Sequence, residues 1–173
     1  MGKKSSDLHI AIPGEWVPRE ETLGGTLDAI AEKFPKNDAL VYPRRKFRLS
    51  YAEFRGKCDE LAKGLMALGI KKGDKVSAWA NNVPEWVLLQ FATAKIGAVL
   101  VTVNTAYKAR ELEYLLKQSD TTTLFVIKEF KGVDFVGQLL TVAPEIGKSR
   151  PGKLKTAKLP LLKNIVFIGE QKM

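Results

Sequence analysis

Apolar residues occur in short, continuous runs along the later two thirds of the chain. Four such runs lack polar alternation and lie at 75–80, 98–103, 121–127 and 165–168. Three segments with helical spacing of their apolar positions separate them, at 82–95, 110–118 and 133–142. Continuous apolar runs are typical of strands that are buried on both faces. The alternation predicts an α/β fold, an open and mainly parallel sheet with helices on both faces.

The longest helical pattern follows residue 50. Ser50 and Glu53 form a capping-box pattern, and Gly69 stands where a left-handed residue ends a helix. The apolar residues between them follow one helical stripe, which consists of Phe54, Cys58, Leu61, Leu65 and Leu68. A single helix with this stripe against the core is therefore expected.

A small N-terminal hairpin is expected before that helix. Strand-like segments at 39–42 and 47–49 flank a basic turn, 43–46. A short helix is expected ahead of the hairpin, with Thr26 as its N-cap and Pro35 as its end. Its apolar positions are Leu27, Ile30, Ala31 and Phe34. The glycine pair before this helix, 24–25, favours a chain reversal.

The composition excludes several kinds of site. Among 173 residues, Cys58 is the only cysteine and His9 is the only histidine. An internal disulfide, a cysteine-rich zinc module and a two-histidine metal site are therefore excluded, and no metal-ligand set is expected. Only His9 could supply a histidine base to a Ser or Cys nucleophile.

Positive charge is concentrated near the C-terminus. The chain has 28 Lys+Arg against 19 Asp+Glu, a net charge of +9. The segment 148–163 contains no acid, and its cations are Lys148, Arg150, Lys153, Lys155, Lys158 and Lys163. Proline and glycine interrupt this segment, and no aromatic residue in it could stack on a base. A solvated basic loop is favoured over a nucleic-acid site, so no nucleic-acid partner is expected.

No transmembrane segment is expected. The most apolar stretch, 86–103, contains Gln90, Lys95 and Gly97. A spanning helix needs about 20 largely uninterrupted apolar residues. The N-terminus lacks the apolar core of a signal peptide. A cytoplasmic location is expected, and the sequence leaves both a peripheral membrane association and a homodimer open.

Sheet geometry selects the candidate binding loops. No phosphate loop of the G-x-x-x-x-G-K-[ST] kind and no G-x-G-x-x-G fingerprint is present. Ligands of open parallel sheets bind beyond the carboxyl ends of the strands, which selects the loops 81–83, 104–108 and 128–131. The candidate residues in the last two are Asn104, Thr105, Tyr107, Lys108, Lys128 and Lys131. The competing interpretation is that Asn104 and Thr105 only cap and turn the chain, while the lysines are solvated.

Five segments, in order, resemble the adenylate-forming, AMP-binding superfamily of acyl-CoA synthetases, luciferases and peptide-synthetase adenylation domains. They are 49–54 (LSYAEF), 68–76 (LGIKKGDKV), 82–86 (NVPEW), 94–99 with 103–104 (AKIGAV and VN), and 111–116 (ELEYLL). The variant TVNTAY at 102–107 is most similar to fatty-acid CoA ligases of the medium- and long-chain group. The resemblance implies the N-terminal subdomain of an acyl-CoA synthetase-like fold.

The resemblance also implies an activity for the full-length protein. Such ligases use ATP and Mg²⁺ to convert a carboxylate to an acyl-adenylate, from which a CoA thiol displaces AMP. The family's Ser/Thr/Gly-rich phosphate loop, magnesium motif, ribose-binding Asp, hinge residue and catalytic Lys are absent from these 173 residues. The catalytic residues are accordingly expected downstream of Met173. The chain itself is expected to be an inactive N-terminal fragment that binds no cofactor tightly.

In relatives, CoA follows the loop after the second core motif and basic residues after the next strand. By position these are the loops 104–108 and 128–131, so the resemblance implies CoA binding by the six candidates above. Thr105 and Ala106 stand where the clearest CoA-binding relatives have glycines. The alternative function is a stand-alone nucleotide- or CoA-binding module without catalysis. The expected organisation is an extension (1–21), the α/β subdomain (22–147), the basic loop (148–163) and a last strand with a truncated end (164–173).

Overall fold

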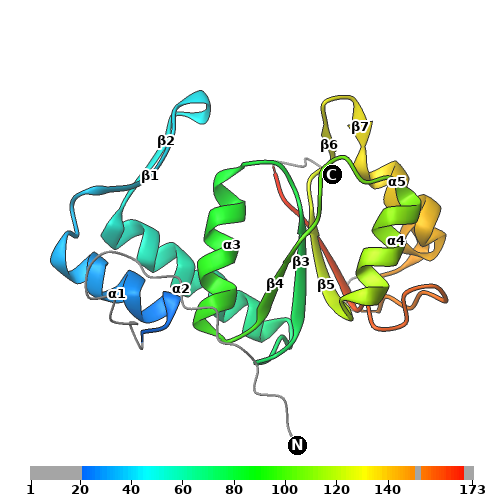
Figure 1. Cartoon of the computed structure of the whole chain (residues 1–173), viewed down its shortest axis with the longest axis horizontal. Coiled ribbons are helices and arrows are strands. Elements are labelled where there is room, and N and C mark those ends of the chain that lie inside the picture. Colours follow the sequence, from blue (N-terminus) through cyan, green and yellow to red (C-terminus); the bar gives the residue numbers. More distant parts are fainter. Residues whose placement is uncertain (1–20, 151–152, 170–173) are drawn as a thin grey trace, which may run out of the picture.

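The computed structural model describes residues 21–150 and 153–169. These residues form three layers, with a central sheet and helices on either side of it (Figure 1). Most of the expected N-terminal extension, His9, and the last residues of the expected truncated end lie outside the described residues. None of the helices in the described part has the length and apolarity that crossing a bilayer requires.

The central sheet has four strands. They are β3 (Lys75–Trp79), β4 (Val99–Thr102), β5 (Thr121–Val126) and β8 (Asn164–Phe167). Their order is β4-β3-β5-β8, and every neighbouring pair is parallel. Lys75 is in register with Val99 on one side and with Thr121 on the other. The predicted parallel α/β sheet is confirmed.

Helices cover both faces of this sheet, as predicted. On one face lie α2 (Tyr51–Ala67) and α3 (Pro84–Lys95), which pack on Val76, Ala78 and Phe125. On the other lie α4 (Ala109–Gln118) and α5 (Phe135–Val142), which pack on Trp79, Leu124 and Val126. The strand side chains alternate between two apolar cores, which explains why the runs show no polar alternation.

Helix α2 keeps the predicted cap but not the whole predicted stripe. The Ser50 hydroxyl accepts a hydrogen bond from the Glu53 N–H, and the Glu53 carboxylate accepts one from the Ser50 N–H at 2.8 Å. Gly69 ends the helix with φ of +85°. Leu68, however, is 46% exposed, and Ile70, at 4%, takes its place in the core. Gly69 adopts a left-handed conformation that turns the chain. The apolar side chain that packs into the core is therefore that of Ile70, after the glycine, and not that of Leu68, before it.

The first helix, α1 (Leu23–Lys33), begins earlier than predicted. Thr22, not Thr26, is its N-cap, and the Thr22 hydroxyl accepts a hydrogen bond from the Gly25 N–H at 3.0 Å. The glycine pair therefore lies inside the first helical turn, and the predicted chain reversal is wrong. Gly24 is required for packing, because a β-carbon there would lie 2.9 Å from Lys95 Cγ.

Lys95 joins the three helices on this side of the sheet. Its Nζ lies 2.5 Å from Asp28 Oδ1 on α1 and 2.8 Å from Asp59 Oδ1 on α2, and its side chain is 13% exposed. Burial lowers the pKa of the Lys95 ammonium, but the hydrogen bonds to the two carboxylates outweigh burial and raise it. The lysine is therefore charged at neutral pH and holds α1 against α2 and α3.

Two hairpins extend beyond the sheet (Figure 1). The first, predicted from the sequence, pairs β1 (Asp38–Tyr42) with β2 (Phe47–Ser50) around the 3-10 helix η1 (Pro43–Arg45). The second pairs β6 (Glu129–Phe130) with β7 (Val133–Asp134) and was not predicted. Lys131 and Gly132 at its turn have φ of 48° and 77°. The predicted helix 133–142 consequently starts later, at Phe135, with Asp134 as its cap.

The basic segment follows the 3-10 helix η2 (Pro144–Lys148). Between residues 153 and 163, Thr156, Leu159 and Leu162 are buried and anchor the chain. The lysines between them are exposed. Glu145 and Glu113 partly neutralise the segment, because Glu145 accepts a hydrogen bond from the Ala157 N–H and Glu113 pairs with Lys158 at 3.6 Å.

The α2 stripe yields a stability prediction with an internal control. Leu65 is 1% exposed, so Leu65→Ala is expected to lower the free energy of unfolding by about 2–5 kcal/mol. Leu68→Ala removes the same atoms from an exposed site and is expected to change it by less than about 0.5 kcal/mol. Urea denaturation of both variants measures the difference. Equal losses would show that the two leucines are buried alike.

Candidate functional site

The strand order reverses between β3 and β5. From β3 the chain crosses to β4 on one side of the sheet, and then returns to β5 on the other side of β3. In open parallel sheets, ligands bind outside the carboxyl ends of the strands at such a reversal. The loops that follow Trp79 and Val126 are therefore the expected walls of a binding site.

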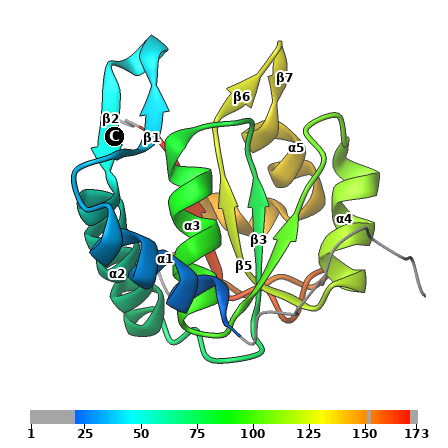
Figure 2. The ribbon, with the colours of Figure 1, turned by 60° about the vertical axis from the view of Figure 1, so that its left-hand side comes forward.

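An open cleft of about 660 Å³ lies at this position. Its lining residues are Tyr42, Pro43, Arg44, Ala80, Asn81, Asn82, Thr105, Phe130 and Lys131. They come from the ends of β3, β4 and β5 and from the two hairpins. Figure 2 shows both hairpins at the end of the molecule toward which the strands of the central sheet run.

The 104–108 loop has a defined local structure. The Asn104 side-chain oxygen accepts a hydrogen bond from the Ala106 N–H at 2.9 Å, and the Asn104 carbonyl accepts one from the Tyr107 N–H at 3.1 Å. The Trp79 indole N–H donates to the same carbonyl at 3.2 Å. Trp79 is fully buried and stacks on Phe135 of α5, with ring centroids 4.1 Å apart. A buried aromatic pair thus holds the loop to the sheet.

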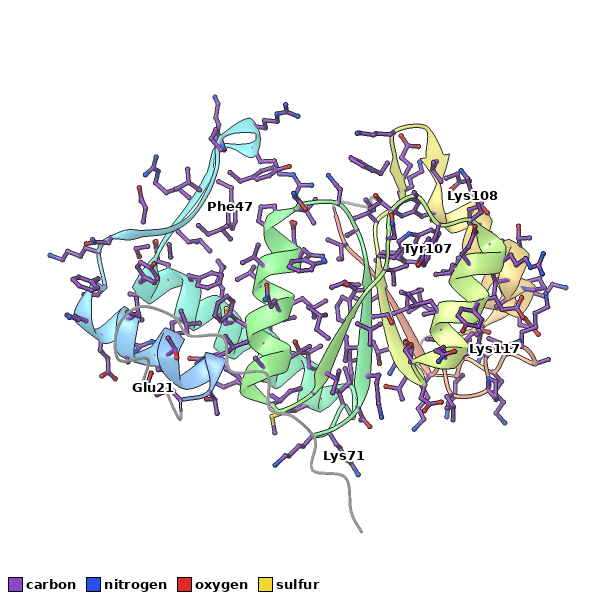
Figure 3. All side chains as sticks on the ribbon, in the orientation of Figure 1. Glu21, Phe47, Lys71, Tyr107, Lys108 and Lys117 are labelled. Atoms are coloured by element: carbon purple, nitrogen blue, oxygen red, sulfur yellow. The ribbon has the colours of Figure 1, made fainter. Side chains whose placement is uncertain are left out.

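The structure brings only two of the six predicted residues into the cleft. Thr105 and Lys131 line it. Tyr107 packs against the apolar core beneath α4, and Lys108 stands at the start of α4 (Figure 3). The Lys108 N–H donates to the Glu111 carboxylate at 2.9 Å.

The hydrogen bonds of Asn104 and Lys128 mainly fix the conformation of the backbone. Asn104 forms the turn described above, and the Lys128 carbonyl accepts a hydrogen bond from the Phe135 N–H at 3.0 Å. The Lys128 and Lys108 side chains are exposed beside the cleft-lining loops. The observed contacts of Asn104 therefore agree with the interpretation that this residue turns the chain.

Sequence reasoning missed the wall formed by the first hairpin. Tyr42, Pro43 and Arg44 line the cleft although they precede the sheet in the chain. An ion pair fixes this hairpin to the start of α3, with Arg45 Nη1 at 3.0 and 3.2 Å from the two Glu85 carboxylate oxygens. The basic turn 43–46 was the available signal. The position of the hairpin, however, depends on contacts with α3 that are distant in sequence: this exposed ion pair, and the packing of Leu40 and Phe47 in one apolar cluster with Val87.

The cleft suits an anionic ligand with a planar group. Arg44 and Lys131 are its charged residues, and none of its lining residues is an acid. Tyr42 and Phe130 add aromatic surface, and Asn81 and Asn82 add amides that can donate and accept hydrogen bonds. These groups can bind and orient a nucleotide-like ligand.

The described residues offer neither a reactive thiol nor a cluster of metal-binding side chains. Cys58 is buried, and desolvation raises the pKa of its thiol to about 12, so it is not a thiolate nucleophile at neutral pH. No cluster of three or more His, Cys, Asp or Glu side chains in residues 21–150 and 153–169 could hold a metal ion.

A family model described as "AMP-binding enzyme" matches residues 27–164. Among curated proteins, the chain is 47% identical over 152 residues to "Putative acyl-CoA synthetase YngI" of Bacillus subtilis. It is 40% identical over 148 residues to the mitochondrial medium-chain acyl-CoA ligase ACSF2 of Rattus norvegicus. These matches cover 88% and 86% of the chain but 28% and 24% of the relatives. The chain thus spans about a quarter of their length.

Solved structures show the same fold. The N-terminal domain of FACL13 from Mycobacterium tuberculosis aligns with a TM-score of 0.67 at 28% identity, covering 85% of this chain and 34% of that one. The anthranilate CoA ligase AuaEII aligns with a TM-score of 0.73 at 24% identity, covering 91% of this chain and 26% of that one. The second likeness bears on the fold alone.

Asn104 offers a test of the loop. Asn104→Ala removes the acceptor of the Ala106 N–H and is expected to cost about 1 kcal/mol of stability and to speed hydrogen exchange at Ala106. Asn104→Asp keeps an acceptor and serves as the matched control. Hydrogen exchange followed by NMR measures both effects. If the Ala106 amide exchanges equally fast in the two variants, the side chain does not organise this loop.

Proposed function

Because this chain belongs to the AMP-binding enzyme family, we propose that it supplies the CoA-binding part of an ATP-dependent, AMP-forming acyl-CoA synthetase. The family match over residues 27–164 and the relatives named acyl-CoA synthetase or ligase support this. The proposed substrate is a medium- or long-chain fatty acid. The TVNTAY variant at 102–107 and the name of the ACSF2 relative support that class.

The proposed reaction has two steps. The carboxylate attacks ATP to give an acyl-adenylate and pyrophosphate, and the CoA sulfur then attacks the acyl carbonyl and releases AMP. Mg²⁺ would neutralise the phosphates of ATP in the first step. The described residues do not fit a magnesium site, since they hold no metal-binding cluster. The part of the reaction assigned to this chain is therefore the binding and orientation of CoA.

The observation that carries the proposal is the meeting of Thr105 and Lys131 in one cleft at the strand reversal. These residues come from the two loops in which the family resemblance places CoA. The Lys131 ammonium, with Lys108 and Lys128 beside it, would attract the phosphates of the nucleotide end. Asn104 and Tyr107 shape the loop, and the Thr105 hydroxyl offers a hydrogen bond from within the cleft.

A CoA titration tests this site. In NMR spectra of the labelled chain, CoA is expected to shift the amides of 104–108 and 128–131, more strongly than dephospho-CoA does. An exposed phosphate–lysine contact contributes about 1 kcal/mol, so Lys131→Ala and Lys128→Ala are each expected to weaken binding roughly 5-fold. Lys57→Ala, on the exposed side of α2, is the charge-matched control. Shifts confined to 148–163, or equal losses in all three variants, would contradict the assignment.

A second prediction concerns chemistry. The 173-residue chain alone is expected not to release pyrophosphate from ATP with a fatty acid, because it contains no phosphate-loop motif and no metal cluster in its described residues. A coupled pyrophosphate assay, with an active acyl-CoA synthetase as the positive control, measures this. CoA binding together with pyrophosphate release would show that this chain has catalytic residues of its own.

A further inference from the structure

The cleft has two walls that come from different parts of the chain. The second hairpin supplies Phe130 and Lys131, and the first hairpin supplies Tyr42, Pro43 and Arg44. In Figure 1 the two hairpins stand on opposite sides of the strand ends. The first wall therefore has ligand-facing groups to which the proposed function gives no role.

The backbone on both sides of Arg44 is held in place. The Lys46 N–H donates a hydrogen bond to the Pro43 carbonyl at 3.0 Å, which closes the turn around η1. Arg45, the next residue, is bound to Glu85 at the start of α3, with 3.0 Å between Nη1 and Oε1. The position of the Arg44 backbone is therefore set before a ligand arrives, and less ordering is needed on binding.

Acids of the hairpin and of α3 do not cancel the Arg44 charge. The other two arginines of this hairpin have acidic partners, Arg45 with Glu85 and Arg48 with Asp38. In the part of the chain that the structure describes, Arg44 forms no salt bridge. The residues that line the cleft include no acid. An anion in the cleft would therefore meet a guanidinium whose charge is available to it.

A second hollow continues from the first wall. Its volume is about 320 Å³, and it shares Tyr42 and Asn82 with the cleft. It lies between the first hairpin and the start of α3, and the rest of its lining is apolar, namely Leu40, Val83, Pro84, Trp86 and Val87. The two spaces thus present their groups in one order: lysine at the second hairpin, arginine at the first, and apolar surface beyond it.

CoA carries its groups in a matching order. Its 3′-phosphoadenosine is joined to a diphosphate, and the diphosphate is joined to the less polar pantetheine arm that ends in the thiol. In the function proposed above, Lys131 and its neighbours Lys108 and Lys128 attract the nucleotide end. A diphosphate offers adjacent oxygens to the planar fork of a guanidinium, which can bind two of them at once, whereas a lysine acts as a point charge.

We propose that Arg44 binds the 5′-diphosphate of CoA and thereby directs the pantetheine arm toward the apolar hollow beside α3. This inference rests on the proposed function, because it takes CoA to be the ligand of the cleft. It adds a binding residue from the first hairpin, which neither the strand-end rule nor the family resemblance selects.

Two ligands separate the diphosphate contact from the 3′-phosphate contact. Dephospho-CoA keeps the diphosphate and lacks the 3′-phosphate. Arg44→Gln is expected to weaken the binding of CoA and of dephospho-CoA by the same factor, roughly 5-fold, because both ligands lose one charged contact. Lys131→Ala is expected to weaken CoA more than dephospho-CoA, and so to lower the affinity ratio that Arg44→Gln leaves unchanged. NMR titration of the labelled chain measures both affinities.

Lys46→Gln is the matched control. It removes the same charge from the same hairpin, at an exposed position that does not line the cleft. Either affinity is expected to change less than about 2-fold, because a distant exposed charge is screened by salt. Circular dichroism verifies that both glutamine variants, which lie at exposed positions, are folded.

The path of the arm has its own readout. CoA is expected to shift the amides of Arg44, Trp86 and Val87, whereas adenosine 3′-phosphate, which has neither the diphosphate nor the arm, is expected to leave them in place. Equal effects of Arg44→Gln and Lys46→Gln, while CoA still shifts 104–108 and 128–131, would overturn the role of Arg44 and leave the CoA site standing. Weakening of CoA alone by Arg44→Gln would also overturn it, because the contact would then be to the 3′-phosphate. If CoA shifts neither loop in the parent chain, the proposed function fails and this inference with it.

Discussion

Parallel pairing of the four strands is the constraint on which the rest of the structure depends. It requires crossovers through helices, which cover both faces of the sheet. They bury the central strands β3 and β5 between two apolar cores, whereas the edge strands β4 and β8 stay partly exposed. It also sends all strand ends to one edge and all strand starts to the other. The cleft and both hairpins lie at the edge where the strands end.

Local patterns predicted the elements well because their determinants are local. The Ser50–Glu53 box and Gly69 fix the ends of α2 through contacts within one helical turn. The continuous apolar runs predicted the parallel sheet because a strand that is buried on both faces has no solvent-facing side on which polar residues would alternate. One error was a choice between two local caps, since Thr22 rather than Thr26 caps α1. The other depends on tertiary packing, because Ile70 rather than Leu68 enters the core after α2.

The candidate site was only partly predictable, because contacts between residues far apart in the sequence shape it. The strand-end rule selected the loops 81–83, 104–108 and 128–131, and Asn81, Asn82, Thr105 and Lys131 do line the cleft. The rule cannot say which side chains turn inward, and Tyr107 is half-buried against the core instead. Nor can it foresee the wall formed by the first hairpin, because this hairpin is placed by its packing on α3 and by the Arg45–Glu85 pair, whose residues are 40 positions apart.

The contact between Gly24 and Lys95 has a consequence for sequence variation among relatives. A β-carbon at position 24 would also lie 3.4 Å from the Lys95 α-carbon, so a larger residue there must displace α3 backbone or change position 95. Loss of Lys95 would leave Asp28 and Asp59 without the cation between them. The residues tolerated at positions 24, 28, 59 and 95 therefore depend on one another. In relatives they are expected to change together, as a correlated quartet spread over three helices.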